Sequence, residues 1–358
     1  MYKSNIIDLF AGIGGFHIGA SSSYCKIARK INPLIVSEVE NSCQEIYRKN
    51  FNCEVLGDIN NIPIYDYKNY EVDLITAGFP CQPFSNSGRK LGLEDPRGKF
   101  YYKIEEFIKH FEPKSFILEN VLGIKKNGGG NYNSLLSSYP QKIGKTMKFL
   151  EDNLVKLSNY SIKWIELNSA DFGSPQVRKR VYIIGLHKDF NKIVLNFPFF
   201  KENNFISIVD KIKQPNLELN NNQKENILSF MSNPPSINHG MRRVGQAYLC
   251  KGGNVGQAYH AYGKVPTLTK VWAKFLPIYF PHDSENLPKI GEKKFVPNEF
   301  YGKGYIRKAS IKELAALQGF PKSYILHEKR TIASEHLGNS VNTKVIEAII
   351  DLLITSIY

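Results

Sequence analysis

The residues best suited to covalent chemistry form the tetrapeptide Pro80-Cys81-Gln82-Pro83. It follows residues 72–78, an apolar run that is typical of a buried strand. Each proline fixes the backbone φ angle and removes a hydrogen-bond donor, so the loop has few alternative shapes. A cysteine on such a loop is aimed in one direction, as a nucleophile requires. The alternative is an inert cysteine packed in the interior, which the tetrapeptide alone leaves open.

Three carboxylates occupy places where ligands bind in parallel sheets. Glu119 follows the apolar residues 115–118, Glu38 follows residues 34–37, and Asp58 comes after the next helical pattern. The carboxyl ends of parallel strands line the ligand cleft, so Glu119 could be a catalytic group. Glu38 and Asp58 could accept hydrogen bonds from a ribose and an adenine. A loop or N-cap role for Glu119, and a solvated surface position for the other two, stay open.

A basic stretch, residues 176–180, leads into another apolar strand pattern. In an extended chain Gln176, Arg178 and Arg180 would share one face, because side chains alternate along a strand. Such a face would suit an anionic or carbonyl-bearing substrate. A solvated basic edge is the alternative.

Residues 8–15, Asp-Leu-Phe-Ala-Gly-Ile-Gly-Gly, end the first strand pattern and open the first helical one. Glycines at that point let a ligand approach the backbone near a helix N-terminus. The glycine spacing is not GxGxxG, which argues against a nicotinamide cofactor. A tight turn with no ligand is the other interpretation.

Strand and helix patterns alternate over the first 190 residues, which predicts an α/β fold. We expect a Rossmann-like, mostly parallel sheet with helices on both faces. Strands are predicted at residues 6–10, 34–37, 72–76, 115–118, 162–167 and 181–186, and helices at 17–30, 41–50, 103–110, 145–157, 310–317 and 343–357.

Residues 190–305 lack this alternation and are rich in Pro, Asn, Gly and Lys. They contain a local repeat, residues 244–248 and 255–259, on either side of the turn signal Lys251-Gly252-Gly253-Asn254. This arrangement predicts a β-hairpin or an exposed glycine-rich loop. We therefore expect two domains: residues 1–190 with 328–358, and a smaller irregular, β-rich domain with its hinge over residues 191–327.

The composition of the chain indicates which kinds of partner and which cellular compartment are expected. The formal net charge of +14 favours a polyanion, although a lysine-rich bias of the genome would have the same effect. The five cysteines are odd in number and irregularly spaced, so neither a disulfide framework nor a zinc site is expected. No run of about 18 apolar residues is present, and the N-terminus does not resemble a signal peptide. We expect a cytoplasmic protein that does not contact a membrane.

Six sequence blocks, taken in order, resemble those of the DNA (cytosine-5)-methyltransferase family of the prokaryotic restriction-modification type. They are Phe10-Ala11-Gly12-Ile13-Gly14-Gly15, Gly78-Phe79-Pro80-Cys81-Gln82-Pro83-Phe84-Ser85, Glu119-Asn120-Val121, Gln176-Val177-Arg178-Lys179-Arg180, Leu317-Gln318-Gly319-Phe320-Pro321 and Gly338-Asn339-Ser340-Val341. The similarity covers residues 4–190 and 306–358. Six blocks in this order are far more specific than any one of them.

The resemblance implies that Cys81 adds to C6 of a cytosine that is flipped out of the duplex, so that C5 can accept a methyl group. Glu119 would contact N3 and the exocyclic amine of the ring. Arg180, with Arg178 near it, would polarise O2. Asn120 would fix the loop that carries the cysteine. The alternatives are methylation of structured RNA, a non-catalytic DNA-binding protein and, from a further class, an oxidoreductase.

The same resemblance implies S-adenosylmethionine as cofactor, S-adenosylhomocysteine as product, and no metal. Its predicted contacts are Phe10, Ala11, Gly12, Ile13, Gly14, Gly15, Glu38, Val39, Asp58, Ile59, Gly78, Pro80, Phe100, Asn339, Ser340 and Val341. Phe10 would stack on the adenine. Val39 departs from the family, where a bulky aromatic residue is common, so stacking on the other adenine face would be weaker.

Double-stranded DNA is the expected partner. Its predicted contacts are Gln82, Ser85, Arg97, Arg242, Arg243, Lys251, Gly252, Gly253, Asn254, Gln257 and Thr267. Asn254 is the candidate for entering the vacated base stack, and Thr267 lies in a segment expected to pack on the DNA backbone. For residues of the insert, a plain surface loop is the alternative. We expect a monomer that is associated with the nucleoid. A cognate restriction endonuclease could belong to the same system, and the enzyme would not need to contact it directly.

Overall fold

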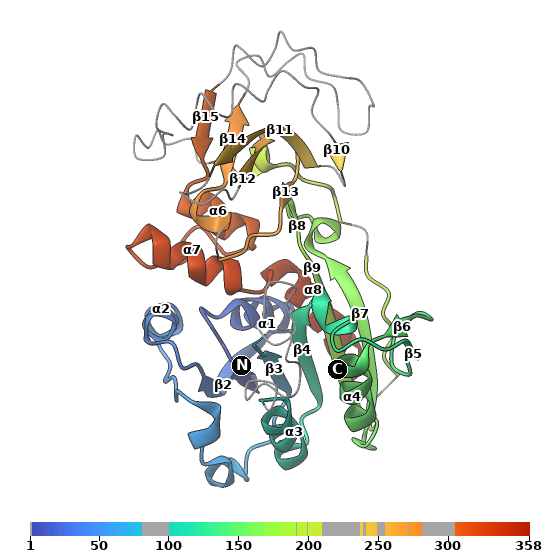
Figure 1. The fold of residues 1–358 in the computed structure, drawn as a ribbon. Helices are drawn as coiled ribbons and strands as arrows, with labels where there is room; N and C mark the ends of the chain where they lie inside the picture. The colour runs from blue at the N-terminus through green and yellow to red at the C-terminus, as the bar shows by residue number, and fades with distance from the viewer. Residues whose placement is uncertain are drawn as a thin grey trace. The chain divides into compact units, whose positions relative to one another are not determined.

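A computed structural model describes residues 2–80, 100–190, 192–198, 200–209, 237–238, 241–248, 255–270, 272–280 and 305–358. The chain divides into two compact units (Figure 1). The first comprises Met1–Asn168, Lys179–Phe199 and Thr343–Tyr358, and the second Ser169–Arg178 and Phe200–Asn342. These divisions differ from the predicted domain boundaries, because residues 169–178 and 328–342 form their contacts within the second unit.

The first unit contains a six-stranded sheet in the order β2-β1-β3-β4-β9-β7 (Figure 1). Strands β1 to β4 run parallel to one another, and β9 runs antiparallel to both β4 and β7. The expected mostly parallel sheet is therefore present, with β9 as the one reversed strand of this sheet. Its strands are β1 Tyr2–Leu9, β2 Arg29–Ser37, β3 Leu74–Gly78, β4 Ser115–Val121, β7 Tyr160–Asn168 and β9 Lys179–His187.

Helices cover both faces of this sheet, as the sequence predicted. They are α1 Gly15–Lys26, α2 Asn41–Phe51, α3 Phe100–Phe111, α4 Lys145–Leu154 and α8 Thr343–Ile357. Ile183 of β9 joins the buried cluster that includes α3 and α4. The next residue, Ile184, lies beside Ile349 and Leu353 of α8. Consecutive residues of a strand point to opposite faces, so these helices lie on opposite sides.

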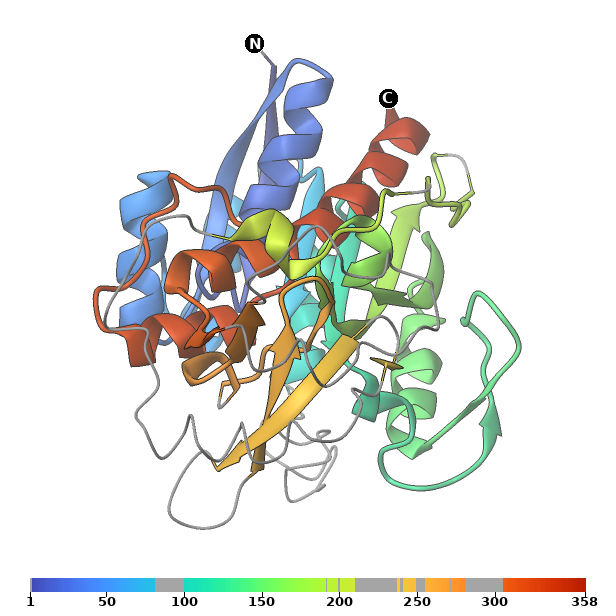
Figure 2. The same cartoon turned by 90° about the horizontal axis from the view of Figure 1, so that it is seen from above.

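Helices α1 and α8, from the two ends of the chain, lie side by side (Figure 2). Ser23 donates a hydrogen bond to the carbonyl of Glu347 over 3.0 Å. Lys26 forms ion pairs with Glu347 at 2.6 Å and with Asp351 at 2.7 Å. Helix α1 ends earlier than predicted, because Ala28 adopts a φ of 56° and turns the chain into β2. Among the described residues, no helix is long and apolar enough to cross a membrane.

The second unit contains a five-stranded sheet in the order β10-β11-β12-β14-β15. Strands β11 and β12 pair antiparallel, with Gln246 opposite Gln257, which confirms the paired strands predicted from the repeat. The turn residues between them lie outside the described part of the chain. The strands are β10 Ile237–Asn238, β11 Met241–Tyr248, β12 Val255–His260, β14 Pro277–Phe280 and β15 Tyr305–Lys308.

Smaller elements complete the two units. In the second unit β8 Gln176–Val177 pairs with β13 Val265–Pro266, and the α-helices among its described residues are α6 Ile311–Leu317 and α7 Arg330–Asn339. In the first unit β5 Tyr132–Asn133 pairs with β6 Lys142–Ile143. The described single-turn helices are η1 Ile59–Asn61, η2 Ile64–Tyr67, η5 Leu122–Lys125, η6 Ser169–Phe172, η7 Phe205–Ile208 and η9 Trp272–Lys274.

Candidate active site

The loop after β1 has the backbone shape that its glycines predicted. Gly12 and Gly14 adopt φ angles of 54° and 82°, and Gly14 caps helix α1. Phe10 adopts a φ of 56°, a conformation that costs free energy in a bulky residue and recurs at functional sites. A Cβ atom built on Gly12 would meet no described atom within 4 Å. The loop therefore has room beside its backbone for a ligand.

Glu38 is bound to this loop. Its Oε2 accepts a hydrogen bond from the Gly12 amide over 2.8 Å, and its Oε1 accepts one from the Glu40 amide over 2.8 Å. The neighbouring Val39 side chain is 67% exposed. The ring of Phe10 meets that of Phe100 edge-on, with centroids 5.3 Å apart. Four predicted cofactor residues are thus brought together in two direct contacts, Glu38 with Gly12 and Phe10 with Phe100.

The remaining predicted cofactor residues are spread over several elements. Asp58 accepts hydrogen bonds from the amide and the side chain of Asn60, both over 2.9 Å, and so caps η1. It stays near Glu38 because Ser37 donates to the carbonyl of Gly57 over 2.8 Å. Ala11, Ile13, Gly15 and Ile59 are buried, and Pro80 is half-buried. Asn339, Ser340 and Val341 belong to the second unit.

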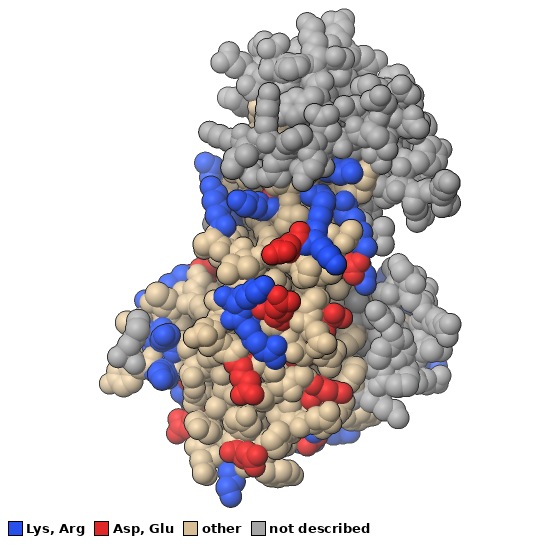
Figure 3. All heavy atoms as spheres, turned by 90° about the vertical axis from the view of Figure 1, so that its left-hand side faces the viewer, with Lys and Arg blue, Asp and Glu red and all other residues tan. Residues whose placement is uncertain are grey.

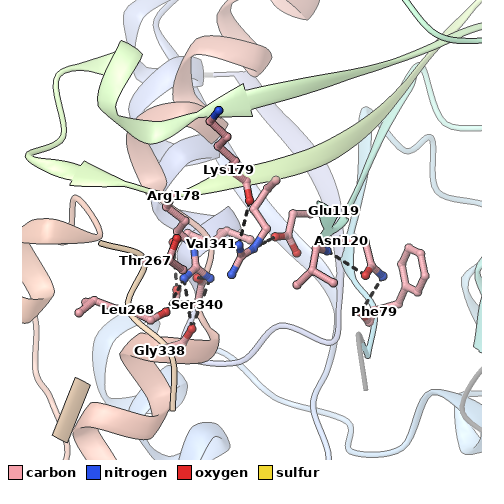
Figure 4. A network of polar contacts seen from close by, with 12 residues as sticks. Phe79, Glu119, Asn120, Arg178, Lys179, Thr267, Leu268, Gly338, Ser340 and Val341 are labelled. Atoms are coloured by element: carbon pink, nitrogen blue, oxygen red, sulfur yellow. Dashed lines mark hydrogen bonds and ion pairs between the residues drawn. The ribbon is translucent and has the colours of Figure 1, made fainter. Parts of the chain in front are cut away.

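The predicted acid and its neighbour lie at the end of β4. Glu119 stands opposite Gly78 of β3 in the parallel register. The buried Asn120 donates a hydrogen bond from Nδ2 to the carbonyl of Phe79 over 3.3 Å (Figure 4). Its Oδ1 accepts from the Val121 amide over 2.9 Å. This places a fixed side chain on the backbone two residues before Cys81.

Several predicted residues lie outside the described part of the chain. They are the nucleophile Cys81 and the DNA contacts Gln82, Ser85, Arg97, Lys251, Gly252, Gly253 and Asn254. Arg242, Arg243 and Gln257 are described as backbone in β11 and β12, but not as side chains.

Arg180, at the start of β9, forms an ion pair with Glu119. The distance from Arg180 Nε to Glu119 Oε1 is 3.1 Å (Figure 4). Arg180 also donates from Nη1 to the carbonyl of Lys179 over 2.9 Å. The two side chains remain 13% and 12% exposed. A carboxylate and a guanidinium held side by side can bind a ring that offers both hydrogen-bond donors and acceptors.

Arg178 does not share this environment. Its side chain is almost completely buried in the second unit, where it donates to the carbonyls of Leu268 over 2.8 Å and Ser340 over 2.6 Å (Figure 4). Gln176 likewise bonds to the backbone of Leu268. The prediction that Gln176, Arg178 and Arg180 share one face is wrong, because the strand is interrupted at Arg178. Strand β8 pairs with β13 in the second unit, whereas β9 belongs to the six-stranded sheet.

Two features concern the expected DNA contacts, namely the position of Thr267 and the distribution of charged side chains on the surface. The Thr267 hydroxyl donates to the carbonyl of Val177 over 2.8 Å. Basic side chains occur in groups on the face drawn in Figure 3, with acidic side chains among them. In the second unit, Glu335 pairs with Lys270 at 2.7 Å and with Lys274 at 2.5 Å. Part of the positive charge is therefore neutralised within the protein.

Sequence reasoning missed a buried polar network below the glycine loop. Asp8 accepts hydrogen bonds from Thr76 over 2.8 Å and from Tyr47 over 3.2 Å, and the Tyr47 hydroxyl also bonds to His17 Nδ1 over 2.9 Å. Burial raises the pKa of Asp8 to about 7 and lowers the pKa of His17 to about 4. The signal that could have revealed it was Asp8, the one ionisable residue in the otherwise apolar run of residues 6–10.

These features define a doubly wound α/β protein with polar side chains at the ends of neighbouring strands. Solved structures share the fold over nearly the whole chain. A methyltransferase of Entamoeba histolytica, EhMeth, matches with a TM-score of 0.70 and 20% identity, covering 99% of both chains. A putative DNA modification methyltransferase encoded within an Escherichia coli prophage matches with a TM-score of 0.60 and 19% identity, covering 99% of both chains.

Sequence comparisons specify the family. Residues 4–355 match the model of the C-5 cytosine-specific DNA methylases. The type II methyltransferase M.HaeII of Haemophilus aegyptius is 30% identical, over 100% of this chain and 95% of its own length. M.HhaI of Haemophilus parahaemolyticus is 28% identical, over 96% of this chain and 92% of its own length. The chain belongs to the C-5 cytosine-specific DNA methylase family, and it is a DNA (cytosine-5)-methyltransferase.

Proposed function

We propose that this enzyme methylates C5 of a cytosine flipped out of a specific short sequence in duplex DNA, through a covalent bond between Cys81 and C6. Membership of the family supplies the reaction class. The observation that carries the finer proposal is the contact between Glu119 and Arg180, because it joins an acid and a fixed cation at the end of the strand next to Gly78.

The chemistry of the ring requires these two groups. Cytosine C5 is a weak nucleophile until a thiolate adds at C6 and pushes electron density toward C5. That addition places negative charge on the ring, which a proton at N3 and a hydrogen bond at O2 stabilise. We assign the N3 and amine contacts to Glu119 and the O2 contact to Arg180. The contacts of Arg178 favour a positioning role over the predicted catalytic one.

Turnover then requires two bonds to break. After C5 has been methylated, a base removes the C5 proton, the ring electrons return, and the bond between Cys81 Sγ and C6 is released as thiolate. We assign Asn120 a positioning role in these steps, because its hydrogen bond to the Phe79 carbonyl holds the chain that leads to Cys81. A fixed loop lowers the entropy cost of aligning sulfur with C6.

The loop after β1 fits an adenosine-containing cofactor. There is open space beside Gly12, and Glu38 is held by two amides beside the exposed Val39. S-adenosylmethionine, when bound, supplies an electrophilic methyl group on a sulfonium. We assign the adenine to Phe10, Val39 and Asp58, and the ribose to Glu38. We assign duplex contacts to the predicted residues of the second unit together with Gln82, Ser85 and Arg97. We expect the enzyme to act as a monomer in the cytoplasm, associated with the nucleoid.

Two measurements test this proposal. Bisulfite sequencing of host DNA expressing the chain should show 5-methylcytosine at one short motif. A duplex carrying that motif with 5-fluorocytosine at the target should form a covalent adduct, since the C5 fluorine cannot be removed as a proton. Cys81→Ser should abolish both, whereas the matched control Cys25→Ser, which alters an exposed free cysteine, should abolish neither.

Two results would contradict it. Transfer of a tritiated methyl group from S-adenosylmethionine to tRNA but not to duplex DNA would favour the RNA substrate. Binding of the cofactor without a covalent adduct to the 5-fluorocytosine duplex would favour a non-catalytic DNA-binding protein.

A further inference from the structure

One buried guanidinium joins two backbone segments of the second unit. Arg178 is 3% exposed, and its Nη1 donates to the carbonyl of Leu268 over 2.8 Å. Both Nη1 and Nη2 approach the carbonyl of Gly338 at 3.3 Å, and Nη2 donates to that of Ser340 over 2.6 Å (Figure 4). We call residues 267–270 the threonine segment and residues 338–340 the end of α7. Arg178 thus bonds to both.

The two segments also touch directly. A Cβ atom at Gly338 would lie 2.7 Å from the carbonyl carbon of Thr269 and 2.8 Å from the amide nitrogen of Lys270. Real Cβ atoms do not approach backbone that closely, so the contact depends on glycine. A shift of the end of α7 is therefore transmitted to the threonine segment without an intervening flexible side chain.

The threonine segment is fixed on its other side by the chain around Arg178. The amide of Leu268 donates to Gln176 Oε1 over 3.1 Å, and Thr267 donates to the carbonyl of Val177 over 2.8 Å. Residues 265 and 266 continue this contact as strand β13 on β8. The segment therefore lies between β8 and α7, and Arg178 reaches across it.

The chemistry of arginine suits this place. Gly338 and Ser340 supply carbonyls at the C-terminal end of α7, where the helix dipole is negative and a cation is stabilised. A planar guanidinium can donate in several directions at once, whereas a lysine ammonium is a compact point charge. Lysine at this position could keep the charge but could not hold the same three carbonyls.

We propose that Arg178 is a positioning residue that couples DNA binding to cofactor binding. The proposal rests on the proposed function, and on the predictions from the sequence that Thr267 contacts the DNA backbone and that Asn339 and Ser340 contact the cofactor. Because one side chain holds both segments, a ligand that orders one segment orders the other. Each ligand then raises the affinity for the other by the same factor.

The test measures that factor. The dissociation constant of a fluorescent duplex carrying the mapped site is determined with and without saturating S-adenosylhomocysteine. We expect the cofactor product to tighten wild-type binding at least about 5-fold. Arg178→Lys should reduce this ratio to below about 2-fold, which corresponds to less than about 0.4 kcal/mol of coupling. Gly338→Ala, which forces the segments apart while the arginine itself is kept, should lower the ratio as well.

The matched control is Arg330→Lys. Arg330 is also an arginine of the second unit that donates to a backbone carbonyl, that of Ala309 over 2.6 Å. It should lower stability and leave the ratio at its wild-type value. Two results would overturn this inference and leave the proposed function in place. One is that Arg178→Lys shows the same ratio as the wild-type protein, and the other is that the wild-type protein itself shows a ratio of one. A wild-type protein that bound neither duplex nor S-adenosylhomocysteine would instead remove the proposed function and the inference with it.

Discussion

Arg178 and Arg180 are two residues apart, yet their surroundings differ in kind. Arg180 stays 13% exposed and faces a carboxylate, whereas Arg178 is 3% exposed and faces backbone carbonyls. A buried guanidinium bonded to carbonyls holds the fold together, because leaving those carbonyls without a donor would be costly. A partly open ion pair can exchange its partner for a ligand. The comparison teaches that residues of one motif can differ in burial, and we expect the less buried one to contact the substrate.

The largest expected effect falls on the open pair. Arg180→Leu should lower kcat about 10²–10³-fold, because it removes a fixed donor for charge that develops on the substrate. Arg178→Lys should change kcat less than about 10-fold, because its partners are backbone carbonyls. Single-turnover methylation at saturating duplex and cofactor measures both. Equal losses in the two variants would break the distinction.

Removing the other half of that pair tests the same region. Glu119→Gln should lower kcat about 10²–10⁴-fold by removing the group that shares a proton with N3, with little change in the dissociation constant of the duplex. The same single-turnover assay, with a filter-binding measurement, separates the two quantities. A variant with wild-type kcat would exclude Glu119 from the chemistry.

The buried network of Asp8 and His17 should affect stability as a function of pH. The raised pKa of Asp8 contributes stability that is present below pH 3.8 and is lost as the pH rises to about 7. The lowered pKa of His17 contributes stability that is present above pH 6.5 and is lost as the pH falls to about 4. The two contributions oppose each other over nearly the same range, and each amounts to roughly 3–4 kcal/mol.

Single substitutions should therefore expose opposite slopes. Asp8→Asn should leave the His17 contribution, so that stability relative to wild type rises between pH 4 and 7. His17→Gln should leave that of Asp8, so that relative stability falls over the same range. Urea unfolding at a series of pH values measures both. Parallel curves for the two variants would show that these groups do not titrate as their burial predicts.

A smaller effect is expected at the half-buried Glu38. Glu38→Gln should raise the KM for S-adenosylmethionine about 10-fold with kcat unchanged, because it would replace the charge-assisted bonds that we assign to the ribose by neutral ones, which are about half as strong. Glu40→Gln, two residues further on and exposed, is the matched control. Steady-state kinetics at saturating duplex distinguishes them. An unchanged KM would place Glu38 among the structural residues.

The smallest effect should follow Asn120→Ala. It removes the hydrogen bond from the Val121 amide as well as the one to the carbonyl of Phe79. The bond to Phe79 is the one that holds the chain before Cys81, and its loss, worth about 1 kcal/mol, should slow adduct formation with the 5-fluorocytosine duplex about 5-fold. Asn127→Ala, which alters a buried asparagine bonded to Thr146, is the control for stability alone. If both variants formed the adduct equally fast, Asn120 would have no part in holding the loop.

The sequence by itself determined the family, the strand and helix order of the first unit and the local geometry of the glycine loop. These depend on neighbouring residues: alternating side chains make strands, and glycines permit the positive φ angles at positions 12 and 14. The pairing of β11 with β12 could likewise be predicted, because the repeat flanks a turn.

Only the tertiary structure decided which polar residues meet. The contact of Glu119 with Arg180 joins residues 61 positions apart across an antiparallel pair of strands, whose register no local pattern specifies. The division at Arg178 arises because β8 pairs with β13 of the second unit, a contact about 90 residues away. Burial depends on such long-range packing, and burial separates the arginine that holds backbone from the one that faces a carboxylate.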